Sequence, residues 1–141
     1  MIKKSGSVVW TGAGKTGKGE ITTQSGVLQN APYGFATRFE DKPGTNPEEL
    51  IGAAHASCFA MALSFKLDEA GFKAQELRTT AVVSLDKDGD GFKVTESALT
   101  LKGKVDGITH ERFRELAETA KKGCPISKLL NTTITLNVEL Q

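Results

Sequence analysis

The sequence predicts an α+β fold in which antiparallel strands surround a long, apolar helix that a second subunit helps to cover. Three observations support this prediction. β-prone segments with glycine-rich turns begin the chain, a Thr- and Val-rich hairpin lies in its second half, and residues 47–70 form an uninterrupted apolar helix. The length of 141 residues, without repeats or a linker, fits a single domain that spans residues 1–141.

The N-terminal third is expected to form strands connected by turns. Ser5 to Thr23 are typical of a hairpin, because β-prone residues flank a segment that contains several glycines. The segment from Tyr33 to Phe39 alternates in part and lies between Pro32 and a turn at 41–44, which predicts a short strand. Arg38 falls near the end of that strand.

Several signals indicate that a helix begins at Pro47. Asn46 is a favourable N-cap, proline is favoured at the first helical position, and two glutamates follow in the first turn. Gly71 is a natural end, so the helix covers Pro47 to Ala70 and is about 36 Å long. Its middle is apolar nearly all round, and such a helix must be buried on most sides. Because a monomer of 141 residues has little material to cover it, we expect an obligate homodimer.

The second half of the chain is expected to contain a long hairpin, two helices and a closing strand. These are strands over 77–85 and 92–104 around a turn at 86–91, a helix from the cap Thr109 to Gly123, a short helix after Cys124, and a strand over 134–140.

Composition and charge exclude several classes of partner. The chain has 18 basic and 17 acidic side chains, so its net charge of +1 provides no field that would attract nucleic acid or an anionic membrane. The most apolar stretch, Leu50 to Leu63, is shorter than the ~18 residues that a membrane span requires. No apolar signal segment follows Met1, so we expect a cytoplasmic protein without a nucleic-acid or membrane partner.

Two segments resemble ligand-binding loops, but their contexts favour plain turns. Gly12 to Gly17 match a dinucleotide-binding fingerprint, yet a strand-like segment follows where that motif needs a helix. Asp86 to Gly91 resemble the start of a calcium loop, but Ser97 occupies the position that needs a bidentate glutamate. Both segments are therefore interpreted as hairpin turns.

The two cysteines, Cys58 and Cys124, are the main candidates for chemistry. Two thiols cannot build the disulfide framework of a small secreted protein, and in a reducing compartment thiols are buried, metal-bound or catalytic. With His55 and His110 they could bind zinc, although the paired short spacing of structural zinc ligands is missing. His55 and Cys58 share a helix face and could also be the base and nucleophile of a cysteine hydrolase. The simplest interpretation of His55 is a residue that packs the helix.

A reactive Cys58 requires a nearby cation, because the thiolate is the nucleophile and an apolar helix raises the pKa of a thiol. Arg38 is the candidate, since its segment leads directly into the helix of Cys58. A carboxylate must hold the guanidinium, and Glu48 and Glu49 are available. With Asn46 as N-cap, Glu49 can reach back to the cap, while Glu48 lies about 80° from Cys58 around the helix axis. This geometry favours Glu48 as the partner of Arg38, although a cap one residue earlier would exchange the two roles.

Three separated motifs resemble the OsmC/Ohr family and are closest to its OsmC branch. They are YGFATRFE from Tyr33, GTNPEELIGAAHASCF from Gly44 and GCPIS from Gly123. The resemblance covers essentially the whole chain, and the motifs occur in the family's order. It implies an OsmC-like α+β fold in an intertwined homodimer, which agrees with the dimer expected from the apolar helix.

The resemblance implies a peroxidase that reduces organic hydroperoxides, and hydrogen peroxide more weakly, without a metal, haem or flavin cofactor. Cys58 corresponds to the peroxidatic cysteine, Cys124 to the resolving cysteine, Arg38 to the activating arginine and Glu48 to the carboxylate that orients it. The Cys58 sulfenic acid would be resolved by Cys124 as a disulfide, which a dithiol reductant such as a lipoyl group would reduce. The sequence leaves open an alternative on the same fold, namely a non-catalytic protein that binds a small apolar molecule.

Overall fold

The computed structural model describes residues 1–141 and has an α+β architecture with two three-stranded sheets. The chain divides into two compact units, residues 1–50 and residues 51–141, and each unit contains one of the sheets. The division falls in the first turn of the long helix. The α+β class predicted from the sequence is confirmed.

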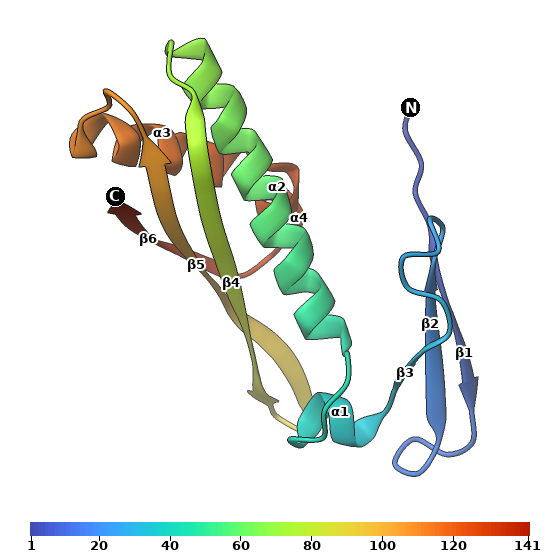
Figure 1. Ribbon diagram of the computed structural model, residues 1–141. Coiled ribbons are helices and arrows are strands. Elements are labelled where there is room, and N and C mark those ends of the chain that lie inside the picture. Colours follow the sequence, from blue (N-terminus) through green and yellow to red (C-terminus); the bar gives the residue numbers. More distant parts are fainter. The chain divides into compact units, whose positions relative to one another are not determined.

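The sheet of the N-terminal unit is antiparallel and has the strand order β1-β2-β3. Its strands, drawn in blue shades in Figure 1, are β1 (Gly6–Thr11), β2 (Lys18–Thr23) and β3 (Ala31–Tyr33). β1 and β2 form the glycine-rich hairpin predicted for Ser5 to Thr23. Gly19 lies opposite Tyr33 in this sheet, and a Cβ atom at Gly19 would overlap the tyrosine ring, so glycine is required there.

The segment after β3 is a short helix, α1 (Phe35–Phe39), so the strand predicted from Tyr33 to Phe39 is wrong beyond its first residue. A local cap explains the difference. The Thr37 hydroxyl accepts a hydrogen bond from the Gly34 N–H at 2.9 Å and donates one to the Gly34 carbonyl at 3.0 Å. These bonds turn the chain away from the sheet. Arg38 consequently lies in the last turn of a helix rather than at the end of a strand.

The long helix α2 covers Pro47–Glu69 and so ends one residue earlier than predicted. Asn46 caps its start, as expected, because the Asn46 side-chain oxygen accepts a hydrogen bond from the Glu49 N–H at 2.8 Å. At the other end, the N–H groups of Gly71 and of the residue after it bond to carbonyls of the last turn. Gly71 has φ of +86°, which explains why glycine ends the helix.

The sheet of the C-terminal unit has the strand order β4-β5-β6. The elements of this unit after α2 are β4 (Ala74–Asp88), β5 (Gly91–Val105), α3 (His110–Gly123), α4 (Pro125–Leu129) and β6 (Thr133–Leu140). The predicted hairpin, both helices and the closing strand are confirmed. The turn expected over 86–91 is shorter than predicted, because β4 and β5 stay paired up to Asp88 and Gly91. Gly89, with φ of +61°, makes this tight connection possible.

The pairing of β6 differs from the prediction of antiparallel sheets, because β6 runs parallel to β5. The helices α3 and α4 lie between the two strands along the chain and return it to the first half of β5, where Thr133 pairs with Glu96. A parallel neighbour requires such a crossover connection. The direction of β6 therefore follows from the helices that precede it, and its own alternating pattern does not encode it.

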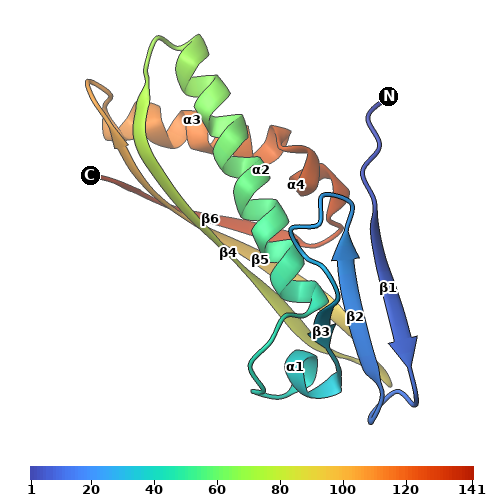
Figure 2. The same ribbon diagram turned by 45° about the vertical axis from the view of Figure 1, so that its right-hand side comes forward.

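The hydrophobic core of the C-terminal unit lies on one face of β5. Alternate residues of this strand are buried there, and they face both α2 and α3, namely Ser97, Leu99, Leu101 and Val105. Figure 2 shows α2 running along this sheet. The helix contributes one buried stripe, formed by Gly52, His55, Phe59, Leu63 and Leu67. This stripe fixes the rotation of α2 on the sheet and therefore the direction of every side chain along it.

The opposite face of α2 is apolar and exposed, so burial on most sides is not achieved within one chain. Met61 is 65% exposed and Phe65 is 59% exposed, and Ala53 and Ala54 lie on the exposed side as well. By length and composition alone, α2 could cross a membrane. The short length of the stretch Leu50 to Leu63 therefore does not by itself exclude a span, because the helix continues beyond Leu63. A core helix passes the same test.

Candidate active site

The two thiols lie together in the C-terminal unit. Cys58 is in the middle of α2 and is half-buried, whereas Cys124 joins α3 to α4 and is fully buried. Their Sγ atoms are 2.7 Å apart, with the Cys124 thiol as donor, and both cysteines are free. The sulfurs of a disulfide are about 2.05 Å apart. The two sulfurs therefore need to move only slightly closer together to form a covalent bond.

The ends of two helices hold Cys124 in place. Its N–H donates to the Ala120 carbonyl in the last turn of α3 at 2.9 Å, and its carbonyl accepts from the Lys128 N–H in α4 at 3.1 Å. Proline follows at the first position of α4, as predicted, and cannot continue the hydrogen-bond pattern of α3. The resolving candidate thus has a defined position at the junction of the two helices.

The local environment raises the pKa of the Cys58 thiol. Burial is the largest cause, and the contact with Cys124 raises this pKa further. A hydrogen bond from the Ile126 backbone N–H has the opposite effect, because it stabilises the thiolate. No cation is among these influences. The contacts of Cys58 in its own unit therefore favour the thiol, and a nearby positive charge stays a prediction from the sequence.

Arg38 and Glu48 form a two-point ion pair in the N-terminal unit. Nε and Nη2 of Arg38 donate to Oε1 and Oε2 of Glu48, both at 2.9 Å. The Glu48 side chain is 12% exposed and the Arg38 side chain 36%, so the carboxylate is shielded while the guanidinium keeps an open side. The hydrogen bond to Glu48 raises the pKa of Arg38 and keeps its charge in place.

Glu48 holds the arginine, as the helical angle indicated, and Glu49 does not. Glu49 supplies its backbone N–H to the cap, but the expected bond from its carboxylate back to Asn46 is not formed. Asn46 also donates from Nδ2 to the Thr37 carbonyl at 3.0 Å, which ties the start of α2 to α1. The cap therefore does two things, because it begins α2 and it brings Arg38 within reach of Glu48.

A small cavity of about 160 Å³ lies against Arg38 in the N-terminal unit. Aromatic side chains dominate its lining, namely Trp10, Tyr33, Phe35 and Phe39. The rings of Trp10 and Tyr33 meet edge to face with centroids 5.6 Å apart, and the guanidinium carbon of Arg38 lies 5.1 Å from the centroid of Phe39. The open side of the guanidinium is thus next to an apolar surface that suits an organic molecule.

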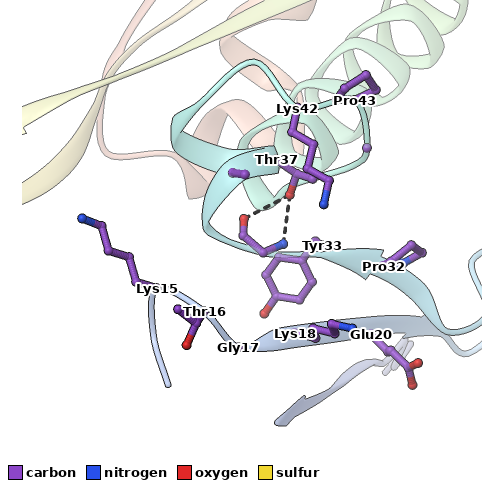
Figure 3. Close-up of a pocket in the computed structure, with 14 residues that line it drawn as sticks. Lys15, Thr16, Gly17, Lys18, Glu20, Pro32, Tyr33, Thr37, Lys42 and Pro43 are labelled. Atoms are coloured by element: carbon purple, nitrogen blue, oxygen red, sulfur yellow. Dashed lines mark hydrogen bonds between the residues drawn. The ribbon is translucent and has the colours of Figure 1, made fainter. Parts of the chain in front are cut away.

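A larger cavity, of about 490 Å³, lies in the same unit but contains neither the paired arginine nor a cysteine. Lys15, Lys18 and Lys42 line it from separate segments, and Figure 3 shows their amino groups well apart. The Thr37 hydroxyl is already engaged by its two hydrogen bonds to Gly34, drawn as dashed lines in Figure 3. Because the lysines are exposed and do not converge, this cavity is not the candidate catalytic site.

His55 is fully buried, and both of its ring nitrogens have serine partners. Nδ1 lies 2.6 Å from Ser97 Oγ, and Nε2 lies 2.8 Å from Ser127 Oγ. Neither nitrogen is free to bind zinc or to act as the base of a cysteine hydrolase, and no group of three or more metal-binding side chains occurs in the chain. The structure therefore supports neither a zinc site nor a cysteine–histidine hydrolase pair at His55. Sequence reasoning missed the serines because they lie 42 and 72 residues away, and only the GCPIS motif pointed to Ser127.

The two loop motifs are hairpin connections, as their contexts indicated. Gly12 to Gly17 connect β1 to the antiparallel β2, so no helix N-terminus faces a nucleotide there. Asp86 to Gly91 include the tight turn between β4 and β5. The chemistry-bearing residues are thus two pairs, a thiol pair in the C-terminal unit and an ion pair in the N-terminal unit.

The chain that contains these two pairs matches a known protein family in its sequence. A family model described as OsmC-like protein matches residues 39–139, which include Cys58, Cys124 and Glu48. This chain belongs to the OsmC family. The relationship inferred from three short motifs is thereby confirmed.

Individual OsmC-family relatives support the assignment along the whole chain. Peroxiredoxin OsmC of Escherichia coli is 53% identical over 140 residues, covering 99% of this chain and 98% of the relative. Organic hydroperoxide resistance protein OhrB of Bacillus subtilis is 30% identical over 124 residues, covering 87% of this chain and 89% of the relative. The crystal structure of OhrB has a TM-score of 0.69 and 30% identity, with 97% of this chain and 98% of that chain covered. An OsmC-like protein of unknown function from Vibrio cholerae has a TM-score of 0.79 at 17% identity, with 98% and 99% coverage, and shares the fold.

Proposed function

We propose that this OsmC-family chain is a thiol peroxidase that reduces organic hydroperoxides, and hydrogen peroxide more weakly, with Cys58 as the attacking thiol. The observation that supports this most strongly is the pair of free thiols 2.7 Å apart, one half-buried in α2 and one fully buried behind it. A relative that is 53% identical is named a peroxiredoxin, and one that is 30% identical is named for resistance to organic hydroperoxides.

The reaction has two steps that balance within the chain and its substrate. The Cys58 thiolate attacks one peroxide oxygen, an S–O bond forms, the O–O bond breaks, and the departing alkoxide takes a proton to become an alcohol. Cys58 is then a sulfenic acid, oxidised by two electrons. The Cys124 sulfur next bonds to the Cys58 sulfur, the S–O bond breaks, and the hydroxyl leaves with the thiol proton as water. The product is a disulfide between Cys58 and Cys124.

Arg38 and Glu48 supply the positive charge that this reaction needs. We propose that the guanidinium stabilises the Cys58 thiolate and the negative charge on the leaving oxygen. Glu48 fixes the orientation of the guanidinium at two points. The shielded carboxylate and the more open guanidinium support this division of roles. No proton relay is required to form the sulfenate, so a histidine base has no part in the first step.

The surroundings of Arg38 favour an organic substrate over hydrogen peroxide. The aromatic cavity next to the guanidinium can bury the alkyl or aryl part of a hydroperoxide, and burial of apolar surface contributes about 25 cal/mol per Å². Hydrogen peroxide has no apolar part and gains nothing from this surface. A dithiol, such as a lipoyl group, would then reduce the disulfide and release both thiols, because a dithiol closes its own disulfide in the exchange.

Thiol titration is the direct test of this function. One equivalent of tert-butyl hydroperoxide per chain is expected to remove two thiols per chain from the reduced protein, because one peroxide oxidises both sulfurs. The measurement is the number of reactive thiols in denaturant before and after the addition, with the mass of the product. If both thiols remained after complete incubation with one equivalent of tert-butyl hydroperoxide, the chain would be a non-catalytic protein that binds a small apolar molecule. That protein is the alternative on this fold.

The exposed face of α2 supports a homodimer, in which a second copy of this chain covers that face. Between Ala53 and Phe65 the exposed residues of this face are Ala53, Ala54, Ser57, Met61 and Phe65, none of them charged, and Asp68 follows only at its end. The face therefore offers an identical chain a self-complementary, largely apolar surface.

We therefore expect sedimentation of the wild-type protein at low concentration to give a single species of twice the chain mass, because a monomer would expose this face to water. Met61→Glu is expected to dissociate or unfold the dimer. Thr119→Glu, on the exposed side of α3, is the matched control and should leave the mass unchanged. A folded wild-type species of single-chain mass would contradict the dimer.

A further inference from the structure

The buried polar side chains of the chain are His55 and Ser97, and the proposed peroxidase chemistry uses neither of them. The imidazole of His55 bridges two elements, because Ser97 lies on β5 and Ser127 lies on α4. A neutral imidazole has one N–H donor and one acceptor nitrogen, and each serine hydroxyl can play the complementary role. Burial lowers the pKa of His55 and keeps the ring neutral near pH 7. His55 is therefore a satisfied two-ended link from the sheet to α4.

The start of α4 is attached to a single turn of α2. Cys124 Sγ lies 2.7 Å from Cys58 Sγ, the Ile126 N–H bonds to the same Cys58 sulfur, and Ser127 Oγ lies 2.8 Å from His55 Nε2. His55 and Cys58 are three residues apart and share a helix face. Two of these three contacts end on the reacting sulfur, whereas the contact between Ser127 and His55 involves no reacting atom.

We propose that His55, together with Ser97 and Ser127, is a positioning unit that holds the start of α4, and hence Cys124, against Cys58 while the disulfide forms. This inference rests on the proposed peroxidase function and concerns its second step. His55 is a positioning residue and not a catalytic one, because the partners of its two ring nitrogens are the serine hydroxyls and not the reacting sulfurs.

The need for such a link follows from the chemistry of the first step. When the Cys58 sulfur gains an oxygen, its contacts with Cys124 and with the Ile126 N–H must change. The bond between His55 and Ser127 involves neither sulfur, so this change does not break it directly, and Ser97 anchors the ring on the sheet side. The rate of S–S bond formation then depends on the fraction of time that the Cys124 sulfur spends next to the Cys58 sulfur. A thiol that is held in place next to its reaction partner reacts at a high effective concentration. Loss of this link therefore slows the second step and leaves the first step unchanged.

Ser127→Ala is the variant that removes the link with the smallest change in packing. In a single turnover with one equivalent of tert-butyl hydroperoxide, sulfenic acid on Cys58 should form at a rate within about twofold of wild type. Formation of the disulfide should be slower by roughly five- to tenfold, the effect expected from the loss of one hydrogen bond. Quenched time points measure the two steps separately, because a dimedone adduct reports the sulfenic acid and a mass loss of two hydrogens reports the disulfide. With excess peroxide, this variant should also accumulate more sulfinic acid on Cys58.

Matched variants separate positioning from general stability. Ser127→Thr keeps the hydroxyl and should restore the wild-type rate of disulfide formation. Lys128→Ala changes the exposed neighbour in α4, and Ser64→Ala removes a hydroxyl that bonds to a carbonyl of α2, so both should behave as wild type. His55→Gln gives a second way to break the link if Ser127→Ala does not fold, and it should slow disulfide formation selectively.

Equal slowing of both steps in the folded variants, or an unchanged rate of disulfide formation, would overturn the positioning role. Failure of the proposed function has a different signature, because the wild-type protein would then form neither sulfenic acid nor disulfide.

Discussion

Cys58→Ser is expected to abolish peroxide consumption, whereas Cys124→Ser should complete one turnover per chain and stop with a sulfenic acid on Cys58. Cys58, half-buried in α2, is the thiol that a peroxide can reach and that can attack it as a thiolate, because Cys124 is fully buried. Without Cys124, the sulfenic acid has no thiol within 2.7 Å and persists long enough to be trapped. Peroxide loss and the mass of a dimedone adduct measure the two outcomes.

The two cysteine variants control for each other, because each keeps one thiol and the same helix junction. Ser57→Ala changes the residue before Cys58, whose hydroxyl bonds to the Ala54 carbonyl of the same helix, and should react as wild type. If Cys124→Ser trapped no adduct while Cys58→Ser still consumed peroxide, the roles of the two cysteines would be reversed.

Arg38→Ala is expected to slow peroxide reduction at neutral pH by roughly 10²–10³-fold, the usual effect of removing a group that stabilises developing negative charge. On the proposed role of Arg38, its loss leaves less thiolate at pH 7, because burial and Cys124 raise the pKa of Cys58. Raising the pH restores the thiolate and therefore recovers part of the rate. The remainder is not recovered, because stabilisation of the leaving alkoxide also depended on the guanidinium. The measurement is the dependence of kcat/KM on pH for wild type and variant.

The orientation of the guanidinium is tested with paired variants. Arg38→Lys keeps the charge but loses the planar two-point contact with Glu48, and it should rescue little of the rate. Glu48→Gln should slow the reaction, whereas Glu49→Gln should not, since the Glu49 carboxylate has no role in the pair. Arg78→Ala, on an exposed part of β4, controls for the loss of any arginine. A pH profile of Arg38→Ala equal to that of wild type would remove Arg38 from the site.

Elements defined by signals close in the sequence were predictable. The cap at Asn46, the glycine that ends α2 and the proline that begins α4 all lie where their local hydrogen bonds require them. The segment from Tyr33 to Phe39 was predicted wrongly, because the Thr37 hydroxyl bonds to Gly34 and converts an alternating pattern into a helical turn. The preference for Glu48 over Glu49 was also predictable, since both positions are fixed by one helix and one cap.

Local sequence patterns establish which residue types are available for chemistry and on which element each one lies. Cys58 within an apolar helix, Cys124 before a proline, and Arg38 followed by acidic residues at a helix start are local facts, because periodicity and capping act over a few residues. The tertiary structure alone brings the sulfurs, 66 residues apart along the chain, to 2.7 Å from each other. It also decided that His55 spans from β5 to α4, and that β6 runs parallel to β5. Such relations depend on how whole elements pack and cross over, and no local pattern of side chains contains that information.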